Sequence, residues 1–250
     1  AMQLQALSGT RGFACVTGAG NESGFRHHYL GKLAPDQKYE DVELRVADST
    51  SGFSMELWAD ASELYTLGFI SPSGEVIERV PMSVGEENTF SFKLDASSIF
   101  ISYQITESSS GRFLAFLRFT APAPGIWHIR VYPTLLVSGQ FHIWLPMQGF
   151  LAEDTGFLRP DPDITITDPG NAPLLLTVST YNHVTGILYI HSSRGFTATG
   201  QIKPDLAAPG VNVQGPGILP GTSRLPRQTD SAVREDVPPS SSIFLTRKTG

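Results

Sequence analysis

Short runs in which apolar and polar residues alternate dominate the middle of the chain. In residues 53–57 the odd positions are Phe, Met and Leu and the even positions are polar, which predicts a strand with one buried face. The same alternation recurs in residues 127–131 and 141–145. Because only residues 133–138 connect the last two runs, we expect these runs to form a β-hairpin with a loop longer than two residues.

Turn-forming residues separate these strands from further ones. Proline, glycine and serine cluster at residues 72–74, 108–111 and 122–125, where they favour tight turns. Many short strands at near-regular spacing are typical of an antiparallel sandwich or jelly roll. We therefore expect an antiparallel β-sandwich at residues 36–148.

The two ends of the chain show another pattern. Leu4 and Leu7 stand at helical spacing before Gly12, which predicts the last turns of a helix leading into a strand at residues 13–17. After the β-rich middle, residues 159–162 (Arg-Pro-Asp-Pro) form a stiff connector, because each proline restricts itself and the residue before it.

Two further strands are expected beyond this connector, at residues 164–167 and 174–178. The second is apolar nearly throughout, as expected for a strand covered on both faces in a parallel sheet. The predicted fold class is therefore α/β, in which a partial parallel-sheet domain is interrupted by the antiparallel β-sandwich.

This pattern divides the chain into four segments. Residues 1–35 and 149–223 are expected to build the α/β domain from both ends, around the sandwich at 36–148. Residues 224–250 combine proline, serine and mixed charges, a composition that buries little and predicts a disordered tail.

Composition excludes several classes of function. Apolar residues make up 40% of the 250 residues and charged residues 17%, with a net charge of −6, which describes a folded domain without the basic stripe of a nucleic-acid-binding protein. No apolar run is long enough to span a bilayer, and the first residues show no secretory signal pattern. The single cysteine, Cys15, lies in an apolar run and is expected to be a buried small hydrophobe.

Other candidate chemistries are weak. In the Gly18-Ala19-Gly20 turn the third glycine of a dinucleotide fingerprint is displaced to Gly24, so no nucleotide site is expected. Adjacent His27 and His28 point to opposite sides of an extended chain, without a cysteine or carboxylate at ligand spacing. Acidic residues at 153–163 lack a calcium-loop pattern and are expected to be solvated, so neither a metal nor a cofactor is predicted.

Residues 200–213 (GQIKPDLAAPGVNV) are followed by Gly221-Thr222-Ser223. The prolines and glycines of this stretch predict a set of defined bends, and neither a helix nor a long strand. By themselves these bends fit an ordinary surface turn with a serine nearby. A second distinctive block stands at residues 15–24 (CVTGAGNESG).

Together the two blocks resemble subtilisin-like serine peptidases (subtilases, peptidase family S8). In that family a "KPD-L-x-APG-V-x-V" run precedes the "GTS" of the nucleophile, and a strand enters an "AGN" turn whose Asn is an oxyanion-hole donor. The middle of the chain is similar to the jelly-roll domain inserted in clostridial subtilases of the Csp type. That likeness is carried by residues 126–132, 141–146 and 149–155. The resemblance covers roughly residues 5–215.

The resemblance implies roles for two residues. Asn21 would be the oxyanion donor; the structural alternative is an asparagine that tolerates left-handed backbone geometry in a turn. Ser223 would be the nucleophile, although Arg224, Leu225 and Pro226 follow it where the family has small residues. The alternative for Ser223 is a coincidental tripeptide in the tail.

The triad partners of such a serine are not in this sequence where the family has them. In the family's chain order the Asp and His precede the AGN turn, but residues 1–20 contain neither, and all six histidines follow Asn21. The chain is therefore expected to be a fragment of a serine endopeptidase that is inactive alone. The resemblance further implies a protein or peptide substrate, possible propeptide contact, and a secreted or spore-associated location in a Gram-positive bacterium.

A second hypothesis from a different class stays open: a non-catalytic β-sandwich that binds a ligand or serves in assembly. Exposed aromatic side chains stack on sugars and peptides, and the sandwich contains Trp58, Trp127 and Trp144. Trp127 shares a strand face with Ile129 and Val131, which predicts that it is core. Trp58 and Trp144 lie opposite the apolar faces of their strands and are the better candidates for exposure.

Overall fold

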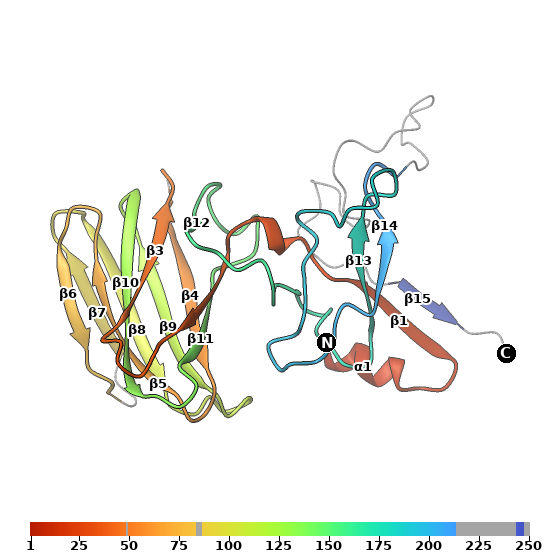
Figure 1. Cartoon of the computed structure of the whole chain (residues 1–250), viewed down its shortest axis with the longest axis horizontal. Helices are drawn as coiled ribbons and strands as arrows, with labels where there is room; N and C mark the ends of the chain where they lie inside the picture. The colour runs from red at the N-terminus through yellow and green to blue at the C-terminus, as the bar shows by residue number, and fades with distance from the viewer. Residues whose placement is uncertain (49, 84–86, 214–243, 248–250) are drawn as a thin grey trace. The chain divides into compact units, whose positions relative to one another are not determined.

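The structure is a computed structural model that describes residues 1–48, 50–83, 87–213 and 244–247, the last four and Glu87 by their backbone alone. Its contacts divide the chain into two compact units (Figure 1). The sandwich unit is Arg26–Asp161, and the terminal unit combines Ala1–Phe25 with the described residues from Pro162 onward. Within the described residues, no helix has the length and apolar character needed to span a bilayer.

The sandwich unit consists of two antiparallel sheets. The six-stranded sheet has the order β2-β11-β4-β9-β8-β7 and the five-stranded sheet the order β12-β3-β10-β5-β6. The strands are β2 (His28–Lys32), β3 (Glu40–Val46), β4 (Gly52–Ala59), β5 (Leu64–Ile70), β6 (Val76–Val80), β7 (Glu87–Phe92), β8 (Ser97–Gln104), β9 (Phe113–Thr120), β10 (Gly125–Leu135), β11 (Gln140–Trp144) and β12 (Gly156–Phe157).

The core lies between these two sheets because each strand turns its apolar positions inward. In β4 the side chains of Phe53, Met55 and Leu57 are buried and those between them are half-buried, which confirms the predicted alternation. Trp127 of β10 is 0% exposed, as predicted. Its ring meets the ring of Phe119, from the opposite sheet, edge-on at a centroid distance of 5.6 Å, an arrangement that aromatic quadrupoles favour.

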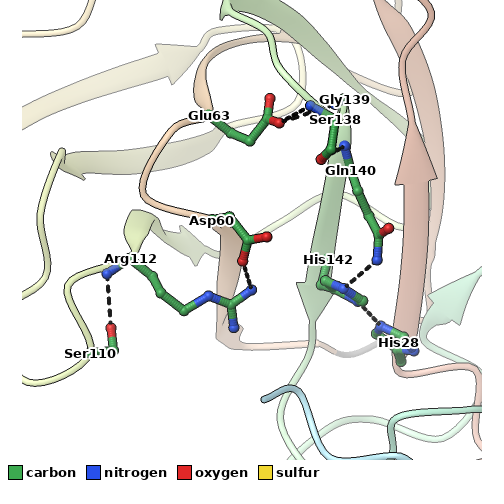
Figure 2. Close-up of polar contacts among 9 residues, drawn as sticks. All are labelled: His28, Asp60, Glu63, Ser110, Arg112, Ser138, Gly139, Gln140 and His142. Carbon is green, nitrogen blue, oxygen red and sulfur yellow. Dashed lines mark hydrogen bonds and ion pairs between the residues drawn. The ribbon is translucent and has the colours of Figure 1, made fainter. Parts of the chain in front are cut away.

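The predicted hairpin between residues 127–131 and 141–145 is wrong, because β10 and β11 belong to different sheets. The connection between them crosses the edge of the sandwich, and one carboxylate fixes its path. Glu63, just before β5, accepts hydrogen bonds from the backbone N–H groups of Val137, Ser138 and Gly139, and Figure 2 shows its carboxylate beside the last two. These bonds satisfy donors that a hairpin would have used in its turn.

The terminal unit is built around one small sheet of order β14-β13-β1-β15. Its elements are the helix α1 (Met2–Ser8), the 3₁₀ turn η1 (Glu22–Gly24), and the strands β1 (Phe13–Gly18), β13 (Leu176–Tyr181), β14 (Leu206–Pro209) and β15 (Phe244–Arg247). The predicted succession of a helix and a strand at its start is confirmed. Strands β1, β13 and β14 are parallel, and β15 is antiparallel to β1.

The predicted α/β class is wrong for the described chain. These residues are mostly β-strand, two of the three sheets are antiparallel throughout, and the one α-helix has seven residues. The expected strand at residues 164–167 is also absent. Ile164 has a φ of +56°, and the N–H groups of Thr165 and Thr167 donate to Arg194 and Ala19, in two separate segments, so no ladder can form.

Within the described residues, the parallel strands bury the side chains of one face and leave leucines of the other face exposed. On the α1 side, Cys15 is buried with Ala172 and Leu175, and Leu4 packs against them, as expected for a cysteine acting as a small hydrophobe. On the other face Leu176 is 41% exposed and Leu206 is 58% exposed. The prediction that residues 174–178 are covered on both faces is therefore wrong in this structure.

Candidate functional site

The turn that follows β1 carries Asn21 and is held from both sides by distant segments. The carbonyl of Ala19 accepts a hydrogen bond from the Thr167 N–H at 3.0 Å, and the carbonyl of Gly20 accepts one from the Ser193 N–H at 2.8 Å. The N–H of Glu22 donates to Ser193 Oγ at 2.9 Å. The backbone on each side of Asn21 is thus fixed by hydrogen bonds, which restricts where its side chain can point.

Gly20 allows this close approach. Its φ is +102°, and a Cβ at this position would lie 2.4 Å from Thr167 Oγ1 and 3.0 Å from Ser193 Oγ. Any larger residue would therefore be strained in its backbone and would displace the two side chains that pack on the turn. Both the positive φ and the close contacts with Thr167 and Ser193 therefore require glycine at position 20.

The end of the turn packs against a buried face of His191. The N–H of Ser23 donates to the His191 carbonyl at 3.3 Å, and the Phe25 ring stacks on the imidazole at a centroid distance of 4.6 Å. A Cβ on Gly24 would lie 2.3 Å from His191 Nδ1. Burial lowers the pKa of His191, against a smaller opposite effect of Glu22, so this imidazole is neutral at pH 7 and can pack against the turn without carrying a charge.

The local structure does not use the Asn21 side chain. Asn21 precedes η1 with a φ of −122° and ψ of 16°, and its side chain makes no capping hydrogen bond. The backbone is therefore outside the left-handed region that would have explained an asparagine structurally. Its Oδ1 is buried and has no hydrogen-bond partner. The unpaired Oδ1 is an acceptor and does not itself bind an oxyanion, so the amide N–H₂ beside it is the donor group that a substrate oxygen can complete.

The proline-rich segment 200–213 is bound to the start of β13 through the side chains of Lys203 and Asp205. Lys203 is 6% exposed, and its Nζ donates to the Leu175 carbonyl and to Asp205 Oδ2, the latter at 2.6 Å. The same carboxylate oxygen accepts the Thr177 N–H at 2.7 Å. The Lys-Pro-Asp sequence thus ties β14 to the start of β13.

The two blocks that carry the sequence resemblance meet in one sheet. Gly18 at the end of β1 is the register partner of Val178 in β13, and Val178 is the register partner of Leu206 in β14. The AGN turn and the APG segment therefore leave the same edge of the sheet, because parallel strands end on the same side. Ser223 lies outside the described residues, as does the predicted tail at 224–250 apart from β15.

Sequence reasoning missed Ser193, Thr167 and His191 as parts of the turn. Ser193 and Glu22 are 171 positions apart in the chain, and Thr167 and Ala19 are 148 apart. Nothing in the local spacing of a lone serine, threonine or histidine indicates such a contact. Only the pairing of β1 with β13 brings their loops together.

The tryptophans of the sandwich give limited support to a ligand-binding face. Trp58 and Trp144 lie on the outer face of the six-stranded sheet, two positions apart in the register of β4 and β11, and both are half-buried. Trp144 stacks on His28 and His142, while the Trp58 indole N–H donates to Glu56. In the described part of the chain, no group of three or more His, Cys, Asp or Glu side chains is arranged to hold a metal ion.

No protein-family model matches the sequence, and no curated protein matches it. Among solved structures, the chain is similar to the CspB protease of Clostridium perfringens, with a TM-score of 0.75 and 26% sequence identity. The similarity covers 86% of this chain and 45% of that protein. This chain is therefore related in structure to a protease. It spans less than half of that protein's length.

Proposed function

We propose that this chain is part of a subtilisin-like serine endopeptidase, in which Asn21 stabilises the oxyanion formed during peptide-bond hydrolysis. Two observations support the proposal. The chain is similar over 86% of its length to a clostridial protease, and the AGN turn holds Asn21 firmly while leaving its side chain without a structural task. The second observation carries the assignment of Asn21.

The chemistry follows from acyl transfer to a serine. The Ser223 hydroxyl would attack the substrate carbonyl while a histidine takes its proton and an aspartate orients that histidine. The carbonyl oxygen then becomes negative, and the Asn21 side-chain N–H₂ would donate a hydrogen bond to it. A donor that is already fixed before the reaction needs no reorganisation at the moment the charge forms, which is why a firmly held turn suits this role.

The 250-residue chain alone is proposed to be inactive. The histidine base and its aspartate precede the AGN turn in subtilases, and residues 1–20 contain no Asp or His. The partner of the complete protease would be a protein or peptide substrate, and a propeptide contact is part of the proposal.

A peptide ester assay tests both statements. The purified chain should show no turnover above buffer. A longer protein that adds the Asp and His blocks upstream should hydrolyse the ester, with activity abolished by Ser223→Ala. Asn21→Ala in that protein should lower kcat by about 100- to 1000-fold, the usual cost of losing one oxyanion donor. Turnover that survives Ser223→Ala in the longer protein would reject the assignment of the nucleophile, and an unchanged kcat in Asn21→Ala would reject the assignment of the donor.

A further inference from the structure

We propose that Ser193 is a positioning residue that sets the direction of the Asn21 side-chain amide. This inference rests on the proposed function for its catalytic meaning, but the positioning itself is a property of this chain. Ser193 touches no reacting atom, because it acts through Asn21.

The geometry that carries the proposal is a two-point contact around one residue. Ser193 donates its N–H to the carbonyl of Gly20 at 2.8 Å and accepts the N–H of Glu22 on its Oγ at 2.9 Å. Gly20 and Glu22 are the immediate neighbours of Asn21. One serine therefore holds the two peptide groups that flank the proposed donor, and together these peptides set the backbone φ and ψ of Asn21.

A substitution at Ser193 can remove only the hydrogen bond that its side-chain Oγ accepts, because the other bond comes from its backbone N–H. Ser193 is 1% exposed, so water has no ready access to replace a lost hydroxyl. Without Oγ, the contact to Gly20 remains and the contact to Glu22 is lost. The ψ of Asn21 is then restrained from one side only, and the amide can swing. Because oxyanion donors must lie within hydrogen-bond reach of a developing charge, a shift of about 1 Å is enough to cost catalysis about 100-fold.

The neighbouring serine provides a matched control. Ser192 is also 1% exposed, and its Oγ accepts a backbone N–H, that of Thr180, at 2.9 Å. Ser192→Ala and Ser193→Ala therefore remove the same group, at the same burial, from hydrogen bonds of the same length. They differ in the peptide that loses its acceptor, and only the peptide held by Ser193 borders Asn21.

The first test uses the 250-residue chain and needs no activity. In a ¹⁵N-labelled sample, the side-chain amide resonances of Asn21 are assigned by their loss in Asn21→Ala. Ser193→Ala should shift or broaden these resonances, and Ser192→Ala should leave them in place. Unchanged Asn21 resonances in Ser193→Ala, or equal changes in both variants, would overturn the proposal. If Ser193→Ala does not fold, Ser193→Cys nearly keeps the volume with a much weaker acceptor and should show the same change.

The second test uses the longer active protein and a double-mutant cycle. Ser193→Ala should lower kcat by about 10- to 100-fold with KM changed less than about twofold, and Ser192→Ala should change neither by more than about twofold. In the Asn21→Ala background, Ser193→Ala should lower kcat no further, because a positioning residue has no effect once the positioned group is gone. If the losses in kcat of Ser193→Ala and Asn21→Ala instead multiply in the double variant, Ser193 does not act through Asn21. An unchanged kcat in Asn21→Ala alone would instead reject the proposed function, whatever the resonances of Asn21 show.

Discussion

Nε2 of His28 lies 3.0 Å from Nδ1 of His142, and this contact joins the two rings on the six-stranded sheet (Figure 2). Nδ1 of His28 lies 3.2 Å from the carbonyl of Asp161, which can only accept, so this nitrogen carries the proton. In the neutral form of His28, Nε2 then accepts from the His142 Nδ1–H. His142 Nε2 in turn accepts from the Gln140 side-chain amide at 3.2 Å. His142 is neutral in this arrangement, an assignment inferred from the pattern of donors and acceptors.

The first prediction is that acid destabilises the sandwich through His142. Burial, with the nearby His28 and Arg112, lowers the pKa of His142 from 6.5 to about 4, against opposite effects of Asp161 and Asp60. Between these two pH values the unfolded chain binds a proton that the folded chain does not. The free energy of unfolding should therefore fall as the pH drops from 6.5 to 4, by roughly 3 kcal/mol in total.

Urea unfolding at a series of pH values measures this effect. His142→Gln should lower stability at pH 7 and flatten the loss between pH 6.5 and 4. The control is Ile143→Val, which lowers stability from the neighbouring position of β11 without removing a titratable group, and should leave the slope as in the wild type. Equal slopes in the wild type and His142→Gln would contradict the assignment.

A second prediction concerns Glu63, the carboxylate that fixes the connection from β10 to β11. Burial acts to raise its pKa, but the hydrogen bonds from Ser138, Val137 and Gly139 outweigh burial and lower it below 4.5. Glu63→Gln keeps the shape and loses the charged acceptor, so it should destabilise the fold by about 3 kcal/mol at pH 7.

The pH profile separates Glu63 from His142. A carboxylate with a lowered pKa stabilises the fold above its unfolded pKa of 4.5, and this contribution is lost as the pH falls through the folded value. Glu63→Gln should therefore abolish only the loss of stability below about pH 4.5. Glu107→Gln makes the same change in an exposed turn and should have a smaller effect on stability at pH 7. A comparable effect in both variants would mean that the Glu63 contact adds little.

The third prediction tests the packing of the Asn21 turn. Gly12 and Gly20 have similar φ values, +92° and +102°, but a Cβ on Gly12 would meet nothing within 4 Å, whereas one on Gly20 would contact Thr167 and Ser193. Gly12→Ala should cost about 1–2 kcal/mol of stability from backbone strain. Gly20→Ala should cost about 1–3 kcal/mol more, from the added contact. Thermal unfolding of the two variants measures the difference, and equal costs would show that the turn has room to relax.

The fourth prediction concerns the buried amine of Lys203. Lys203→Met removes the donor to Asp205 and to the Leu175 carbonyl, and should destabilise the terminal unit by about 2 kcal/mol, since the Asp205 side chain is 31% exposed and water partly compensates. Arg112→Met breaks the pair with Asp60, whose side chain is 73% exposed, and should cost less than about 1 kcal/mol. Hydrogen exchange in β13 and β14 would locate the change. Exchange that stays slow in Lys203→Met would show that Lys203 does not hold these strands together.

Alternation along the chain was enough to predict individual strands of the sandwich. The burial of Phe53 and Leu57 depends on the period of the strand itself, which is local. The choice of a strand's neighbour in the sheet, in contrast, depends on residues far away in the sequence. The alternation predicts one hairpin from residues 127–131 and 141–145, but these strands pair with β5 and β4 in two different sheets. Glu63, which binds the connection between them, lies 74 to 76 positions from the N–H groups it holds. No local pattern carries that information.

The candidate site shows the same limit. The sequence motif alone identifies the AGN turn, and the structure adds that the Asn21 side chain makes no capping hydrogen bond to the turn that follows it. Ser193 could not be found, because a serine that holds a turn from a distant loop has the same appearance in a sequence as a serine on the surface. The α/β prediction failed for a related reason. The apolar run near Leu176 does form a parallel strand, but the helices and further parallel strands that define the class are absent from the described residues.

The parallel pairing of β1 with β13 has a consequence for the order of folding. Val16 pairs with Leu176, and closing an unstructured loop of about 160 residues costs roughly 4–5 kcal/mol in chain entropy, plus a constant. The sandwich unit holds its own two ends together, since the Phe157 N–H donates to the Arg26 carbonyl and the Asp161 N–H to the His28 carbonyl, both at 2.9 Å. Once the sandwich has formed, only residues 19–25 and 162–175 of this loop remain to be ordered between β1 and β13. We therefore expect the sheet that carries Asn21 to assemble last, and a core mutation in the sandwich to delay the formation of a turn that it never touches.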